Sequence, residues 1–169
     1  MTFAIQKLHH FAYRCRDAEE TRQFYEDMLG LPLVHVIQED HVPSTGEYNP
    51  YTHIFFEMKD GSYVAFFDLG DNTAPEPSPN TPAWVNHLAL EVESQDELLA
   101  AKAKIEAAGI KVLGVTDHRI INSIYFFDPN GLRVELTTRT VDDAHMREHA
   151  QVARQKLDAW TARKNQAAG

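Results

Sequence analysis

The sequence contains little cysteine, an excess of acidic over basic residues, and no long apolar run. Cys15 is the one cysteine among 169 residues, so an internal disulfide is excluded. The 25 acidic and 16 basic residues give a formal net charge of −9, which argues against a general binder of nucleic acid or anionic membranes. No run of about 18 apolar residues and no apolar signal-peptide region is present, so we expect a cytoplasmic protein.

Motifs of nucleotide and serine chemistry are missing as well. The chain has no GxGxxG sequence, no Walker sequence and no Gly-x-Ser-x-Gly sequence. We therefore do not expect nucleotide-dependent chemistry or serine hydrolysis.

What the sequence does contain is an internal repeat. Residues 8–33 and 85–112 each begin with a histidine in a strand-like run and continue into an amphipathic helix. A capping-box pair starts each helix and a glycine ends it: Asp17, Glu20 and Gly30 in the first copy, Ser94, Glu97 and Gly109 in the second. Three strand-like segments follow each helix, so each copy has the order β-α-β-β-β.

The repeat predicts the fold class and the domain boundaries. We expect an α+β fold in which two βαβββ modules, residues 1–70 and 84–140, form a curved mixed β-sheet around a metal site. The Pro-rich segment 69–83 is predicted to link the modules, and residues 39–51 are predicted to form a long loop in the first one. Residues 141–169 are expected to form a C-terminal helix and tail.

The predicted C-terminal helix, which we expect to end near residue 163, carries an apolar stripe. The stripe residues recur at intervals of four and three and are Met146, Ala150, Ala153, Leu157 and Trp160. Such a stripe packs against a partner, which is either the body of the same chain or a second copy.

Aligning the two modules predicts a metal site. His10 corresponds to His87, and Glu135, four residues after a turn glycine, corresponds to Ala65. Two histidines and one carboxylate with other positions open form the arrangement that favours Fe(II). Glu135 lies in an apolar strand, where a carboxylate is costly to bury without a partner. Taken alone, each histidine is also compatible with ordinary packing.

The residues that carry these features resemble the vicinal oxygen chelate superfamily, which includes glyoxalases, bleomycin-resistance proteins and extradiol dioxygenases. The resemblance covers about residues 6–138 and is carried by LHHFAYRCRDAEETRQFYEDMLGL, WVNHLALEVES and SIYFFDPNGLRVEL. It implies metal positions at His10, Ala65, His87 and Glu135. Glyoxalase-type isomerases fill all four positions, whereas extradiol dioxygenases leave the second one empty, as Ala65 does here.

The resemblance also implies polar residues in a substrate pocket. Tyr125, about ten residues before Glu135, stands where the family has a pocket tyrosine. His118 and His53 are candidates for the histidine that moves protons, and His35 and His41 are weaker ones. Tyr63 and Phe67 share strand parity with Ala65 and are expected to face the cavity.

The resulting hypothesis is an extradiol-type dioxygenase that cleaves a catechol-like aromatic diol with O₂. Its cofactor is expected to be Fe(II), with Mn(II), Zn(II), Ni(II) and Co(II) as alternatives. We expect a homodimer with no nucleic-acid or membrane partner. Two other functions stay open: a glyoxalase-like isomerase, epimerase or other metal-assisted lyase, and a non-catalytic protein that binds a small molecule such as an antibiotic.

Overall fold

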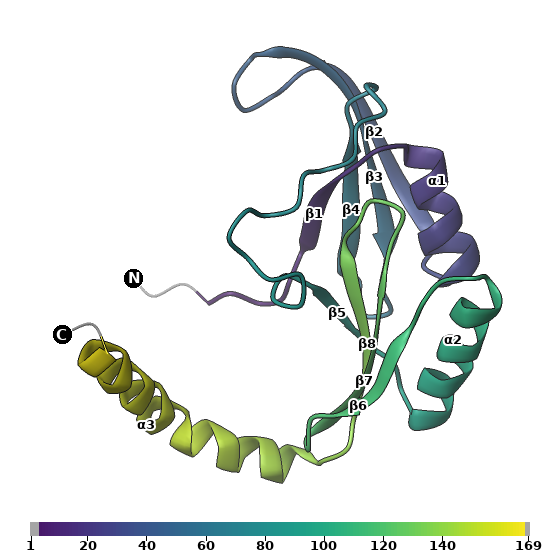
Figure 1. Cartoon of the computed structure of the whole chain (residues 1–169). Helices are drawn as coiled ribbons and strands as arrows, with labels where there is room; N and C mark the ends of the chain where they lie inside the picture. Colours follow the sequence, from purple (N-terminus) through teal and green to yellow (C-terminus); the bar gives the residue numbers. More distant parts are fainter. Residues whose placement is uncertain (1–3, 168–169) are drawn as a thin grey trace.

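The computed structural model describes residues 4–167 and contains two βαβββ modules followed by a long helix (Figure 1). The first module consists of β1 (His10–Cys15), α1 (Ala18–Arg22), the π-helical turn η1 (Gln23–Met28), β2 (Leu33–His41), β3 (Tyr48–Glu57) and β4 (Tyr63–Asp68). The second consists of β5 (Leu88–Glu91), α2 (Gln95–Ala107), β6 (Leu113–Asp117), β7 (Ile121–Phe127) and β8 (Arg133–Arg139), and α3 (Asp143–Ala167) follows it. The predicted α+β fold is confirmed. Residues 1–3 and 168–169 of the predicted units lie outside the described residues.

The two modules form four-stranded mixed sheets with the same topology. The strand orders are β1-β4-β3-β2 and β5-β8-β7-β6, and in each sheet the first strand of the module runs parallel to the last. Ala65 lies opposite Ala12, and Glu135 lies opposite Ala89. Since His10 precedes Ala12 by two residues and His87 precedes Ala89 by two, the register agrees with the alignment of the modules.

Both predicted helix starts are present. The Asp17 side chain accepts a hydrogen bond from the Glu20 amide, and the Ser94 hydroxyl accepts one from the Glu97 amide. These caps satisfy amides that the first helical turn leaves without a partner. After Arg22 the first helix changes to a π-helical turn, in which Phe24 and Tyr25 are both buried.

The predicted long loop at residues 39–51 is wrong in its extent. Strands β2 and β3 continue through most of it as a hairpin, with Glu39 paired to Tyr51 and His41 to Tyr48. Backbone pairing therefore satisfies groups that a loop would leave to water. Pro50 is tolerated because β4 pairs with β3 only from Thr52 onwards in the described register.

The modules are joined by a shared core and by buried hydrogen bonds. Helices α1 and α2 lie on the same side of the two sheets (Figure 1), and the Lys104 ammonium donates to the Met28 carbonyl. The turn between β7 and β8 reaches the first module: the Tyr25 hydroxyl donates to Asp128, and the Asn130 amide donates to the Thr21 hydroxyl. This turn fixes one module against the other.

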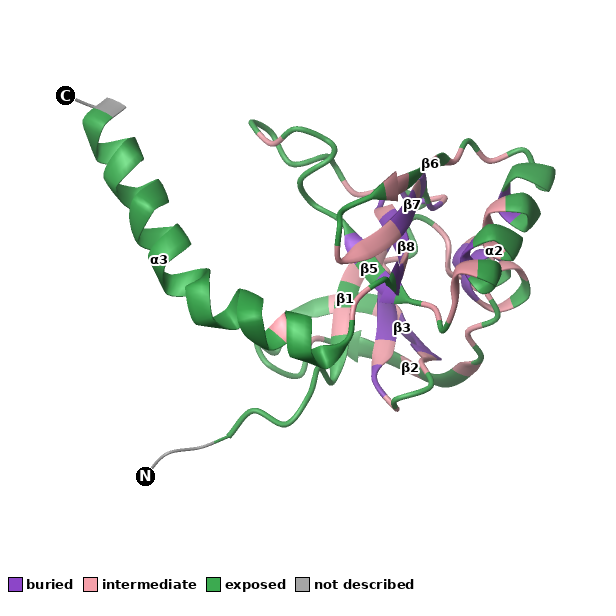
Figure 2. Ribbon diagram, turned by 90° about the horizontal axis from the view of Figure 1, so that it is seen from below, coloured by how far each residue is buried: buried purple, intermediate pink, exposed green. Residues whose placement is uncertain are grey.

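Helix α3 extends away from the body (Figures 1 and 2). Every α3 side chain that the structure describes is exposed except Met146, which is half-buried. The apolar stripe is thus not packed on the described body of its own chain, and contact with a second copy stays a prediction. Among the described residues, no helix combines the length and apolar composition needed to cross a membrane.

Candidate functional site

The candidate site is built around His87 and Glu135 in the second module. The register places Glu135 within β8, where the residue is 4% exposed, and His87 immediately precedes β5. The His87 Nε2 atom lies 3.0 Å from Glu135 Oε2. The structure therefore joins two of the three predicted metal ligands.

The partners of His87 determine what this pair can hold. Its Nδ1 atom lies 2.9 Å from the Val85 carbonyl oxygen, and because a carbonyl only accepts, Nδ1 must carry the hydrogen. In a neutral ring, Nε2 then directs a lone pair at the carboxylate of Glu135. Two facing acceptors need a shared cation, which is either a proton on Nε2 or a metal ion bound to both. The backbone contact is also the support that metal-binding histidines usually have.

Tyr125 and His118 extend the site towards solvent. The Tyr125 hydroxyl donates to Glu135 Oε1 over 3.0 Å and lies 2.7 Å from His118 Nε2. Since the tyrosine hydrogen is directed at Glu135, Nε2 of His118 must donate to the tyrosine oxygen. Tyr125 is half-buried and His118 is exposed, so the chain of bonds leads from the buried carboxylate to water. Burial, the larger cause, and the hydrogen bond to Glu135 raise the pKa of Tyr125.

His10 lies apart from this cluster. Its Nδ1 atom is 2.8 Å from His9 Nδ1, and its ring packs near His53 and Phe55, with centroid separations of 6.0 and 5.7 Å. Within the described part of the chain, no three His, Cys, Asp or Glu side chains come close enough together to hold a metal ion. The three-residue ligand set therefore stays a prediction, with two members in contact and one held by the other module.

The remaining predicted pocket residues lie on the first sheet. The His53 ring stacks on Phe67 at 3.6 Å between centroids, Phe55 packs edge-on against Tyr63, and Ala65 is fully buried. His53 Nε2 is buried and has no hydrogen-bond partner among the residues that the structure describes. Burial first, then the nearby His10 and His35, lowers the pKa of His53 to about 4. The roles predicted for these residues stay predictions.

A cavity adjoins His87. We call it the linker pocket because residues 77–83 of the linker form one side of it; its volume is about 570 Å³. It is also lined by Phe11 and Tyr13 of β1 and by Phe127 and Arg133. No sequence pattern indicates this pocket, because its walls come from β1, the linker and the β7–β8 turn, which only the docking of the modules brings together.

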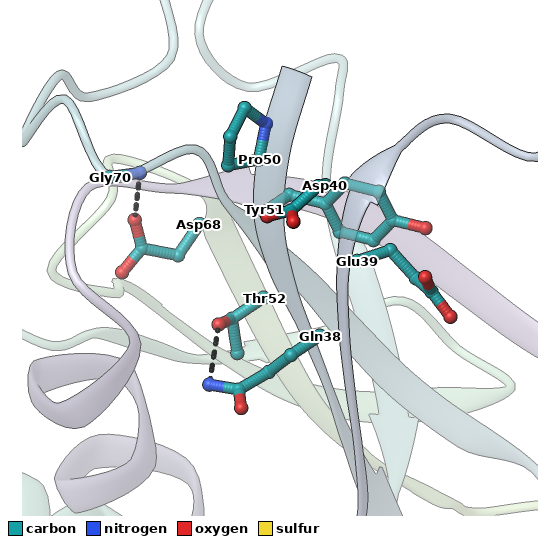
Figure 3. Close-up of a pocket in the computed structure, with 8 residues that line it drawn as sticks. All are labelled: Gln38, Glu39, Asp40, Pro50, Tyr51, Thr52, Asp68 and Gly70. Atoms are coloured by element: carbon teal, nitrogen blue, oxygen red, sulfur yellow. Dashed lines mark hydrogen bonds between the residues drawn. The ribbon is translucent and has the colours of Figure 1, made fainter. Parts of the chain in front are cut away.

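A second cavity, of about 520 Å³, lies beside the last part of β2, the first part of β3 and the end of β4 (Figure 3). Its lining includes the carboxylates Glu39, Asp40 and Asp68. Asp68 is already used in the fold, because it accepts hydrogen bonds from the amides of Ala18 and Gly70. The acidic cavity contains none of the predicted site residues.

Comparison with known proteins identifies proteins that are similar to this chain. Residues 7–136 match the family model described as Glyoxalase/Bleomycin resistance protein/Dioxygenase superfamily. The uncharacterized protein YwkD of Bacillus subtilis (strain 168) is 31% identical over 135 residues, which span 78% of this chain and 96% of that protein.

A biphenyl-2,3-diol 1,2-dioxygenase of Paraburkholderia xenovorans (strain LB400) is 30% identical over 143 residues, or 81% of this chain. The match covers 43% of that enzyme, so the chain spans less than half of its length. A solved structure of a mutant of the fosfomycin resistance protein FosX of Listeria monocytogenes, complexed with Mn(II) and 1S,2S-dihydroxypropylphosphonic acid, superposes with a TM-score of 0.60. It is 18% identical and covers 85% of this chain and 98% of its own, which establishes a shared fold.

Proposed function

Because the chain belongs to the Glyoxalase/Bleomycin resistance protein/Dioxygenase superfamily, we propose that it is a metal-dependent extradiol-type dioxygenase acting on a catechol-like substrate. The observation that carries the proposal is the connected set of His87, Glu135, Tyr125 and His118, in which two potential ligands adjoin a proton path. Similarity to a biphenyl-2,3-diol 1,2-dioxygenase supports the choice of substrate class. Ala65 supports it too, because a non-ligand occupies the position equivalent to Glu135.

His87 and Glu135 are the residues that would hold the metal in this chain. Their donor atoms already face one another, and the Val85 carbonyl and the Tyr125 hydroxyl hold the opposite sides of the two groups. When bound, a redox-active divalent ion such as Fe(II) supplies the chemistry that allows a catechol to react with O₂. Both oxygen atoms of O₂ enter the ring-opened product.

The task of Tyr125 and His118 is to hold and move a proton. A catechol must lose hydroxyl protons before its ring is opened, and a base within hydrogen-bond distance accelerates that step. Tyr125 Oη, between Glu135 and His118, can accept a hydrogen bond from a substrate hydroxyl or donate one to it. His118 at the exposed end contacts both Tyr125 and solvent, so it can pass the proton to water.

The proposal includes a homodimer in which His10 of a second copy joins His87 and Glu135. Two observations support it. His10 is held by the first module, away from the pair, and α3 is not packed on the described body of its own chain. In a twofold dimer, each first module would meet the second module of the other copy, and two equal sites would form.

The first test combines metal binding with oxygen uptake. The protein is purified anaerobically, loaded with Fe(II) and mixed with a panel of catechols. Wild type should bind one metal per chain and consume O₂ while a yellow product forms, whereas His87→Ala and Glu135→Gln should lose both properties. Glu91→Gln is the matched control, because Glu91 is an exposed carboxylate in β5 that pairs with Arg139. Metal binding without O₂ uptake would indicate the isomerase class, and no metal binding at all would leave a binding protein.

A second test separates the proton path from the ligands. Tyr125→Phe should still bind metal but lose about a hundredfold in kcat, because it removes the bridge between His118 and Glu135. Equal activity in Tyr125→Phe would remove this residue from the mechanism.

A third test examines the shared site. Inactive His10→Ala and His87→Ala proteins are unfolded together, refolded as a mixture and assayed. If each site uses both copies, half of the dimers regain one intact site, which gives about a quarter of the wild-type activity. If all three ligands come from one chain, the mixture stays inactive.

A further inference from the structure

The linker pocket differs in charge from the rest of the protein. The chain has a net charge of −9, yet no aspartate or glutamate is among the described residues that line this pocket. Its one residue with a permanent charge is Arg133, and its walls include the aromatic side chains of Phe11, Tyr13 and Phe127. A cavity of about 570 Å³ whose walls combine apolar and aromatic side chains with several polar ones is typical of a small-molecule site.

The Arg133 guanidinium is not neutralised within the described residues. It lies 4.4 Å from the centre of the Tyr125 ring, and no described carboxylate pairs with it. Arg139, on the same strand, instead pairs with Glu91 and Asp143. The carboxylate of Glu135, two residues from Arg133, is occupied by His87 and Tyr125. The donors of Arg133 therefore remain available to a ligand.

From this arrangement we infer that the substrate is an aromatic acid whose carboxylate binds Arg133. The inference rests on the proposed function for the position of the reacting part, because His87 belongs both to the linker pocket and to the candidate metal site. Guanidinium binds a carboxylate through two parallel hydrogen bonds and does so best where water is excluded. Asn86, also in the lining, holds the linker through a hydrogen bond to Ser78 and keeps that wall of the pocket in place.

The position of Arg133 also explains why it would select the substrate and take no part in the reaction. Its guanidinium covers the ring of Tyr125, while the hydroxyl of the same tyrosine contacts Glu135. A ligand that bridges Arg133 and the metal site would pass along this ring. The acid group and the reacting hydroxyls would then occupy opposite ends of the substrate.

The test measures binding, so that its outcome does not depend on turnover. The probes are 3,4-dihydroxybenzoate and its neutral methyl ester, titrated anaerobically by calorimetry into wild type with and without Fe(II). Wild type should bind the acid about tenfold more tightly than the ester or better. Arg133→Gln should reduce this preference to less than about twofold, and Arg133→Lys should retain part of it. Arg139→Gln, which removes one positive charge from the same strand, should leave it unchanged.

Two results would overturn the inference: equal binding of acid and ester by wild type, or an undiminished preference in Arg133→Gln. Failure of the proposed function looks different. If no catechol supports O₂ uptake but the acid is still preferred through Arg133, the dioxygenase proposal is wrong and the anion site stands. If O₂ uptake occurs with catechols while the ester binds as well as the acid, the dioxygenase proposal stands and the anion site at Arg133 is wrong.

Discussion

At the scale of single residues, His53 is a buried imidazole that the fold keeps neutral. Burial, followed by the neighbouring His10 and His35, lowers its pKa to about 4, against about 6.5 in an unfolded chain. Between these two values the unfolded state binds a proton that the folded state does not. The contribution of His53 to stability is therefore present above pH 6.5 and is lost as the pH falls towards 4.

This predicts a pH-dependent difference between wild type and His53→Phe. The phenylalanine keeps the stacking on Phe67 but cannot bind a proton. Between pH 7 and pH 5, wild type should lose about 1.5 to 2 kcal/mol more of its free energy of unfolding than the variant. Urea unfolding with a chelator present measures both values. Parallel losses in the two proteins would show that His53 does not cause the acid sensitivity.

Cys15 is a second residue whose chemistry is determined by its surroundings. It is 1% exposed, and burial is the main cause that raises its pKa to about 11. Because the thiolate is the reactive form, the native thiol should react with an alkylating reagent at least about a hundredfold more slowly than the unfolded one. Mass spectrometry after timed labelling, with and without urea, measures this. Rapid labelling of the native protein would contradict the buried position.

At the scale of elements, the turn between β7 and β8 bonds to the other module, whereas its counterpart in the first module does not. Asn130 is 3% exposed; its Oδ1 atom accepts from the Arg16 amide, and its side-chain amide donates to Thr21. The equivalent residue of the first module, Asp60, is exposed. Within the described residues, its carboxylate accepts hydrogen bonds only from the amide and hydroxyl of nearby Ser62, and its backbone carbonyl accepts one from Lys7.

The difference between Asn130 and Asp60 predicts that equivalent substitutions at these two positions lower the free energy of unfolding by different amounts. Asn130→Ala should lower the free energy of unfolding by about 2 to 3 kcal/mol, because buried groups of the other module lose their partners. Asp60→Ala should cost about 1 kcal/mol or less. Chemical denaturation of both variants provides the comparison. Equal costs would mean that the turn does not join the modules.

The same elements indicate what the sequence can and cannot predict. Local signals predicted the modules, the caps at Asp17 and Ser94, and the register that equates Ala65 with Glu135, because each depends on neighbouring residues or on one strand pair. The contact between His87 and Glu135 followed from that register within one sheet. The place of His10 and the linker pocket did not, since both depend on how two modules dock. No periodic signal encodes that docking, and Asn130 and Asp128 determine it through contacts more than a hundred residues apart.

At the scale of the whole molecule, the composition and exposure of α3 support the proposed homodimer. It carries five basic and three acidic residues, whereas the chain as a whole has a net charge of −9, so the helix and the rest of a second copy attract each other. Leu157 and Trp160 in its apolar stripe are 57% and 54% exposed. Large exposed apolar side chains in a row mark a surface that another molecule covers.

We therefore predict that Leu157→Glu combined with Trp160→Glu converts a dimer into a monomer, because two charges cannot be buried in the interface. Analytical ultracentrifugation measures the mass of each form. Since neither side chain packs on its own body in the described structure, the unfolding of each chain at low concentration should change by less than about 0.5 kcal/mol. Gln151→Glu with Gln155→Glu adds the same charge outside the stripe and should stay dimeric. If each site needs two copies, the monomer should also lose the metal although His87 and Glu135 are intact. A monomer that keeps one tightly bound metal would show instead that His10 reaches the pair within its own chain.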